Sequence, residues 1–254
     1  MDYRFNDLEK FNLLLKQTEK FRAKYFEKSH SVRSNIYEIY DSIGCNPFDG
    51  HVTHIFALFA SGSLFNSYLK YFIAADYRID QQYAVHPYGS NSTTNSHMRN
   101  AYGQLITRDD DVTRSFKAKY LMDNNANLDS LSICTNYSVR PKNCGICGKC
   151  IRTKVMFYAG TGSVPNIFNE HKIPNDWYKS INVNNKIQRV FMGDILDSIS
   201  VSKSSEQLNY EDAYKYWHQA AVDGRLGKLL KLKQGFKALK KQLKNNWGAN
   251  KKLS

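Results

Sequence analysis

Four of the five cysteines lie close together in the middle of the chain, with the spacing Cys-x9-Cys-x2-Cys-x2-Cys. They are Cys134, Cys144, Cys147 and Cys150. Thiolate sulfur is a ligand that Zn²⁺ prefers, and Cys-x2-Cys is a spacing found in structural zinc sites. Glycine follows two of these cysteines, at Gly145 and Gly148, and it allows the sharp turn that points backbone N–H groups at the sulfurs. The spacing therefore predicts a bound metal ion, with zinc as the first choice.

The same cysteines allow two other arrangements. A four-cysteine iron–sulfur cluster also uses Cys-x2-Cys-x2-Cys, although the ferredoxin continuation Cys-x3-Cys-Pro is absent after Cys147. Disulfides are the second alternative, but bonds between cysteines so near in sequence are strained. Zinc held by four sulfurs keeps no open position for water, so we expect the ion to hold the fold rather than to perform chemistry. Four basic residues near the cysteines are expected to offset the charge of the thiolates; they are Arg140, Lys142, Lys149 and Arg152.

Arg114 and Lys117 form a second set of chemically capable side chains, in a helix predicted over residues 111–123. Residues three apart on a helix are neighbours, so both cations could face one anion such as a nucleotide phosphate. The competing interpretation is a solvated helix face, because exposed basic residues on helices rarely need a ligand. The sequence leaves both interpretations open.

The elements before this helix are less regular. An amphipathic helix is predicted over residues 7–27. The apolar stretches 51–60 and 64–75 flank a break at Ser61-Gly62-Ser63, and their periodicity does not separate helix from strand. A brief alternating pattern follows over 78–86, and the hydroxyl-rich run 90–96 predicts a loop.

The elements after the cysteines are predicted to be helical. Residues 151–158 have helical character, and the pattern stops at Gly160. Further helices are predicted over 175–181, 186–200, 210–222 and 226–247, and the last of these combines a leucine stripe with many lysines.

The net charge of +13 is concentrated at the end of the sequence. Residues 225–254 hold ten Lys or Arg and no acid, which leaves 26 of the 36 basic residues against all 23 acidic residues. The apolar stripe of this segment needs cover, by the rest of the chain or by a protein partner. A nucleic acid or an anionic membrane surface, bound through residues 225–252, is the alternative.

Composition and length favour a globular protein in a reducing compartment. Apolar residues make up 42% of the 254 residues, enough to bury a sizeable core. The first residues are charged where an export signal needs an apolar run. The longest apolar stretch, Ile55 to Ala60, is far shorter than the roughly 20 residues of a membrane-spanning helix. Because the cysteines are clustered rather than spread, we expect a cytoplasmic protein.

The segment Asn143-Cys144-Gly145-Ile146-Cys147-Gly148-Lys149-Cys150-Ile151-Arg152-Thr153 resembles the zinc-site segment of the 7-cyano-7-deazaguanine synthase group, within the adenine nucleotide alpha-hydrolase (PP-loop ATP pyrophosphatase) superfamily. Two further segments are similar, His86-Pro87-Tyr88-Gly89-Ser90 and Thr113-Arg114-Ser115-Phe116-Lys117, as is Gly50-His51. The resemblance covers about residues 30–160. It implies a doubly wound parallel sheet, ATP at the carboxyl ends of the strands, and substrate adenylation with release of pyrophosphate.

The sequence departs from this family at the phosphate loop, Ser-Gly-Gly-x-Asp-Ser, which is not present. Such a loop converges backbone N–H groups on phosphate oxygens. The nearest similar segment, Ser61 to Ser67, lacks the second glycine and the aspartate, and is better interpreted as a break between elements. We therefore do not expect the chain to turn over ATP by itself.

The sequence as a whole predicts an α/β protein with a doubly wound parallel sheet, incomplete at the N-terminus, with a zinc knuckle and a helical C-terminal extension. The domains are predicted as residues 1–165 and 166–254. The first functional hypothesis is a protein related to an ATP-dependent adenylating enzyme. It is a fragment, one half of a split enzyme whose phosphate loop comes from a partner chain, or a degenerate homologue. The alternative is a zinc-stabilised binding module that docks on RNA, a membrane or a protein through its basic helix. A second copy of the chain is a further partner to consider.

Overall fold

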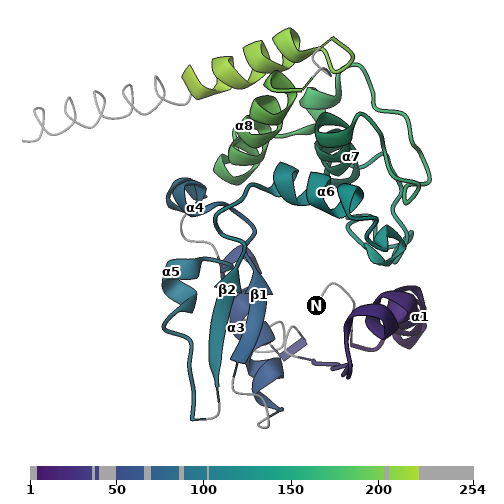
Figure 1. Cartoon of the computed structure of the whole chain (residues 1–254), viewed down its shortest axis with the longest axis vertical. Coiled ribbons are helices and arrows are strands. Elements are labelled where there is room, and N and C mark those ends of the chain that lie inside the picture. Colours follow the sequence, from purple (N-terminus) through teal and green to yellow (C-terminus); the bar gives the residue numbers. More distant parts are fainter. Residues whose placement is uncertain are drawn as a thin grey trace, which may run out of the picture.

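The structure is a computed structural model, and it describes residues 5–35, 38–39, 50–65, 70–85, 89–101, 103–202 and 206–222. The fold is mixed α/β, with helices dominant (Figure 1). The elements are α1 (Leu8–Tyr25), α3 (Gly50–Ser63), β1 (Lys70–Ala74), α4 (Ile79–Val85), α5 (Ser92–Asn95), β2 (Gln104–Arg108), α6 (Arg114–Asp123), the 3-10 turn η1 (Leu128–Ser130), α7 (Gly148–Thr161), the 3-10 turn η2 (Trp177–Ser180), α8 (Lys186–Ser200) and helical residues 210–222. Cys45, His86 and the basic stretch 225–252 lie outside the described residues.

Strands β1 and β2 pair in parallel, with Lys70 opposite Gln104 and Ala74 opposite Arg108. We call these strands together with α3, α4 and α5 the sheet layer. Helix α3 covers one face of the sheet, where Phe59 meets Tyr71 with ring centroids 5.7 Å apart. Over the described residues the sheet has these two strands. Two strands do not establish the doubly wound sheet that the family resemblance implies, so that sheet stays a prediction.

Helices α6, α7 and α8 pack on one another above the sheet (Figure 1), and we call them, with residues 177–222, the helical layer. Their shared core contains fully buried side chains from several elements; among these are Val155, Phe157, Trp177, Met192 and Ile195. Helices α6 and α7 approach closely at Gly160, where an added Cβ would lie 2.8 Å from the Lys119 Cβ. The core continues on both sides of residue 165, the predicted domain boundary.

Several predicted helices are confirmed. Their apolar spacing extends over a few helical turns and does not depend on distant segments. Helix α8 spans residues 186–200 as predicted, α1 falls within 7–27, α6 falls within 111–123, and residues 210–222 are helical. The Asn185 side chain accepts hydrogen bonds from the first N–H groups of α8, which is the usual role of an N-cap residue.

Other predictions are wrong. Part of the predicted loop 90–96 is the short helix α5, capped by the Asn91 side chain. Residues 79–85, for which the alternating pattern gave no assigned element, form helix α4. The helical pattern at 175–181 becomes only a 3-10 turn. Helix α7 continues through Gly160 and ends at Gly162, whose φ of +73° is the left-handed conformation. Gly160 is needed for close helix packing, and Gly162 for the helix end.

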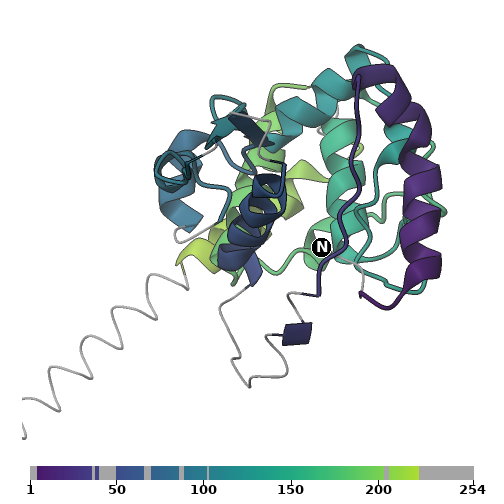
Figure 2. The ribbon, with the colours of Figure 1, turned by 90° about the horizontal axis from the view of Figure 1, so that it is seen from below.

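Helix α1 lies beside the loop that carries the cysteines, away from α4 and α5 (Figure 2). The Tyr137 hydroxyl donates to Asp7 over 2.6 Å, and Gln17 donates to the Pro141 carbonyl. None of its own residues is buried, so α1 covers the loop from outside. No helix within the described residues is long and apolar enough to span a bilayer.

Candidate metal centre

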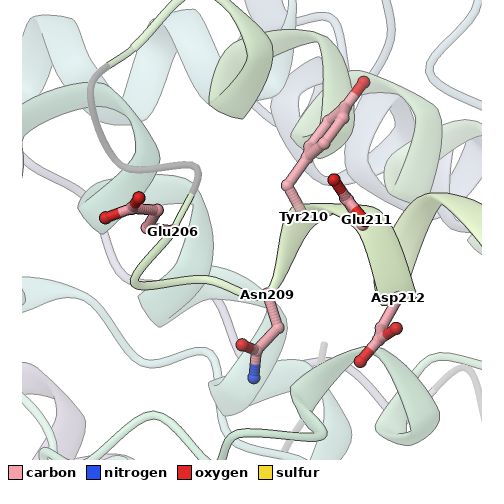
Figure 3. A pocket seen from close by; sticks show the side chains of 5 residues that line it. All are labelled: Glu206, Asn209, Tyr210, Glu211 and Asp212. Atoms are coloured by element: carbon pink, nitrogen blue, oxygen red, sulfur yellow. The ribbon is translucent and has the colours of Figure 1, made fainter.

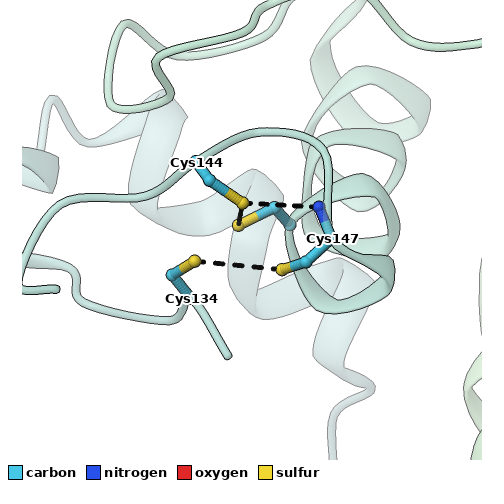
Figure 4. A group of neighbouring side chains, drawn as sticks. Cys134, Cys144 and Cys147 are labelled. Atoms are coloured by element: carbon cyan, nitrogen blue, oxygen red, sulfur yellow. Dashed lines mark hydrogen bonds between the residues drawn. The ribbon is translucent and has the colours of Figure 1, made fainter. Parts of the chain in front are cut away.

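The four predicted cysteines converge at the amino end of α7 (Figure 4). All four Sγ atoms lie within 4.8 Å of one another, and the pairs Cys134–Cys147 and Cys144–Cys150 are each 3.9 Å apart. A tetrahedral Zn²⁺ with bonds of about 2.3 Å holds its sulfurs about 3.8 Å apart. The observed separations therefore fit a single tetrahedral ion. They are far from the about 2.0 Å of a disulfide bond, and the four thiols are free.

The cysteine loop can close only with glycine at position 145. Its φ is +81°, and a Cβ there would lie 2.1 Å from the backbone oxygen of Glu170. The loop is also paired with residues 168–170, through hydrogen bonds from Asn169 N to Asn143 O and from Glu170 N to Cys144 O. The segment 168–170 thus holds the loop in place from the outside.

Asn143 organises the approach to the site, although the sequence analysis named it only as the first residue of the motif segment and gave it no role. Its side chain is buried. The amide oxygen accepts from the N–H groups of Ile133 and Cys134, and the amide nitrogen donates to the carbonyls of Leu131 and Ile167. One side chain thereby connects three chain segments around the first cysteine. A buried Asn with its hydrogen bonds made is costly to replace.

The cysteine loop favours a thiolate at Cys147, which caps the amino end of α7. Burial acts to raise the pKa of Cys147, but hydrogen bonds from Thr135 and Cys150 outweigh it and hold the pKa at about 6. Burial raises the pKa of Cys134 and of Cys150. A metal ion must therefore displace protons from the buried thiols, which makes binding weaker in acid.

The cations near the site are only partly those expected. Arg140 donates through Nε to the Cys134 carbonyl over 2.5 Å. Arg152 points elsewhere, to Gln188 and over the Phe191 ring. The sequence analysis missed Lys154, which is completely buried one helical turn after Cys150. The only sequence signal was the i, i+4 spacing of Cys150 and Lys154, which places both residues on one side of a helix.

Arg114 and Lys117 lie together at the carboxyl end of β1, and both are engaged by the protein. Arg114 pairs with Asp76, and Lys117 donates to the Ala75 carbonyl over 2.6 Å. Burial and the neighbouring Arg152 lower the pKa of Arg114 to about 10. An external anion would have to compete with these internal partners.

The amino end of α6 also binds a side chain of the protein itself. The buried Asp194 carboxylate accepts from the Ser115 N–H and hydroxyl, both over 3.0 Å. A helix amino end favours an anion, and here α8 supplies it. Burial nevertheless raises the pKa of Asp194.

An open depression of about 440 Å³ lies at the start of helical residues 210–222 (Figure 3). Its lining is acidic and consists of Glu206, Asn209, Tyr210, Glu211 and Asp212. Within the described residues, the four cysteines are the group of side chains close enough together to hold a metal ion.

Comparison of the chain with known protein families, with curated proteins and with solved structures finds no match. The family resemblance thus depends on the motif residues themselves, and the cysteine geometry stands as an observation independent of it.

Proposed function

We propose that the four cysteines hold one structural zinc ion. The observation that carries this proposal is the convergence of four sulfur atoms at the separation that one tetrahedral ion requires. In an iron–sulfur cluster the four cysteines bind two or four iron atoms. Their sulfur atoms therefore lie farther apart, taken together, than four sulfur atoms around a single ion. Since all four positions are sulfur, no position is open for a reacting water.

Metal analysis of protein purified under reducing conditions tests the zinc. We expect one zinc per chain, and substitution with Co²⁺ should give the visible spectrum of a tetrahedral tetrathiolate site. Detection of iron together with acid-labile sulfide would instead indicate an iron–sulfur cluster. Protein that contains no metal and takes up none would refute the proposal.

We further propose that the chain is the zinc-bearing part of a PP-loop-type enzyme, similar to the 7-cyano-7-deazaguanine synthase group. Support comes from the motif segments around Arg114 and Cys144, and from the parallel pairing of β1 and β2, an arrangement whose carboxyl ends commonly bind ligands. In such an enzyme a substrate carboxylate attacks the α-phosphorus of ATP. A C–O–P bond forms, and pyrophosphate leaves. The phosphate loop would come from outside these 254 residues.

Calorimetry with ATP tests this role. We expect no ATP binding by the chain alone, and binding when it is mixed with the product of a neighbouring gene that encodes Ser-Gly-Gly-x-Asp-Ser. Pyrophosphate release should then require both proteins. Binding that is absent with such a partner would remove the adenylating role and leave the zinc proposal untouched.

A non-catalytic binding module is the second candidate function. It is favoured by the internal use of Arg114, Lys117 and the amino end of α6, which leaves the described residues without an obvious phosphate site. In this role the basic residues 225–252 would dock on RNA, an anionic membrane surface or a protein. Titration of RNA oligonucleotides and of anionic vesicles at several salt concentrations distinguishes these partners.

A further inference from the structure

Lys154 is the unusual residue of the metal-bearing region, because its side chain has no exposure to solvent. It lies on α7, one turn after Cys150, so it occupies the same side of the helix as that ligand. A buried ammonium is costly unless hydrogen bonds and negative charge compensate it. The surroundings of Lys154 therefore indicate why a lysine is present.

The hydrogen bonds of Lys154 go to backbone carbonyls. Its Nζ donates to Glu170 O over 3.1 Å and to Lys172 O over 2.5 Å. Carbonyl oxygens satisfy the N–H groups, but they are neutral and do not balance a charge. Burial lowers the pKa of Lys154, and the Glu170 carboxylate and the sulfurs of Cys150 and Cys144 act against this lowering. These sulfurs carry negative charge when they bind a metal ion.

One carbonyl that accepts a hydrogen bond from Lys154, that of Glu170, lies against the cysteine loop at Gly145. Glu170 O is the atom that an added Cβ at Gly145 would meet, and Glu170 N donates to the Cys144 carbonyl. Lys154 thus links α7 to segment 170–172, and the same segment is hydrogen-bonded to the cysteine loop. Four thiolates with one Zn²⁺ carry a net charge of about −2, and an ammonium one turn away offsets part of it.

We propose that Lys154 is the positioning residue of the metal centre: it offsets the negative charge of the metal-bound thiolates and holds segment 170–172 against the cysteine loop. This inference rests on the proposed metal site. It assigns to Lys154 the role that the sequence suggested for Lys149 and Arg152.

The test compares Lys154→Met with Lys154→Arg and with the matched control Lys149→Met, which removes a partly exposed lysine next to Cys150 in sequence. Zinc affinity is measured by competition with a chromophoric chelator, and the Co²⁺ spectrum is recorded for each variant. We expect Lys154→Met to weaken zinc binding at least tenfold, and Lys154→Arg and Lys149→Met to change it by less than about threefold. A purely structural role would lower the melting temperature of the metal-free and metal-loaded protein equally, with zinc affinity unchanged.

Wild-type protein provides a second measurement in case Lys154→Met does not fold. Lysine acetylation is followed by mass spectrometry with zinc bound and after chelation. Lys154 should be protected when zinc is bound and become reactive after chelation, whereas Lys149 should change little. Unaltered zinc affinity in Lys154→Met, or equal Lys154 reactivity with and without zinc, would overturn the inference. A wild-type protein that binds no metal would instead refute the proposed function.

Discussion

In the helical layer most residues of α7 are buried. Helices α6, α7 and α8 share one core with residues on either side of α8, at 177–183 and 208–213. Among the described residues before α6, Tyr77, which lies between β1 and α4, and Val85 of α4 belong to that core. The sheet layer also leaves large apolar side chains in solvent, including Phe72, which is 58% exposed, and Phe56, which is 57% exposed. Parallel sheets are normally covered on both faces. Most of the buried apolar core of the described residues therefore lies in the helical layer, and the cysteines belong to a smaller buried cluster. We expect the sheet layer to depend on its junction with the helices.

That junction combines polar and apolar contacts. The polar ones include the Arg114–Asp76 ion pair and the Lys117 hydrogen bond to Ala75. The Tyr77 ring stacks on Phe191 with centroids 4.8 Å apart, and α4 packs on α8. Regions with few buried apolar contacts open at a lower free energy than the core. We therefore expect the two layers to respond differently to the same kind of perturbation.

Removal of the metal should have the largest effect, and it should act on the helical layer. Cys144→Ala, or chelation of the wild type, is expected to lower the melting temperature by at least about 10 °C, since structural zinc contributes directly to folding free energy. Acidification should act in the same direction. Because the ligand thiols must lose their protons to bind the ion, and burial raises the pKa of Cys134 and of Cys150, zinc affinity should fall as the pH falls.

Differential scanning calorimetry with and without chelator measures the first effect, and a chelator competition between pH 5 and 8 measures the second. Equal stability of the Cys144→Ala and wild-type proteins would show that the helical layer does not depend on the metal.

Gly145→Ala should come next. The new Cβ would require a rare positive φ and would collide with the Glu170 backbone, so we expect a loss of about 3 kcal/mol or more together with weaker zinc binding. Gly162→Ala is the matched control, because Gly162 also has a positive φ but no heavy atom near the added Cβ. It should cost only about 1 kcal/mol. Denaturant unfolding of both variants makes the comparison; equal losses would mean that the contact with Glu170 is unimportant.

Arg114→Gln tests the junction between the layers. Because the ion pair with Asp76 is partly exposed, the loss of global stability should be about 1 kcal/mol or less. Amide hydrogen exchange should nevertheless become faster in β1 and β2, while α7 keeps its protection. The exposed Lys119–Asp123 pair offers a control, Lys119→Gln, that should leave exchange in the sheet unaltered. Uniformly faster exchange in both layers would show that the two layers do not open independently.

Phe72→Ala should have the smallest effect. Its ring is largely exposed and contacts the Arg108 guanidinium, 5.1 Å from the ring centroid, so stability should change by about 0.5 kcal/mol or less. The same substitution at Phe157, buried in the helical layer, should cost about 3–5 kcal/mol. Urea unfolding of the two variants compares the layers directly. A large loss from Phe72→Ala would mean that the outer face of the sheet is covered in solution.

Several features of this protein follow from the sequence alone, since they depend on local spacing. The four cysteines were identified as one ligand set, and the amphipathic pattern of residues 186–200 predicts α8 to the residue. Both depend on backbone geometry over a few turns. The hydroxyl-rich run 90–96 was misleading, and the alternation over residues 78–86 assigned no element, because short segments such as α4 and α5 take their conformation from caps and contacts rather than from periodicity.

Long-range contacts decided the remaining features. The spacing of Arg114 and Lys117 predicts that they are neighbours, but only the tertiary structure commits them to Asp76 and Ala75. The doubly wound sheet, the cytoplasmic location and the partners of residues 225–252 stay predictions. The sequence thus determined which atoms can bind a metal, since ligand chemistry belongs to the residues themselves. The tertiary structure decided which charges surround those atoms, because burial of Lys154 and the hydrogen bonds of Asn143 depend on segments that meet only in the folded chain.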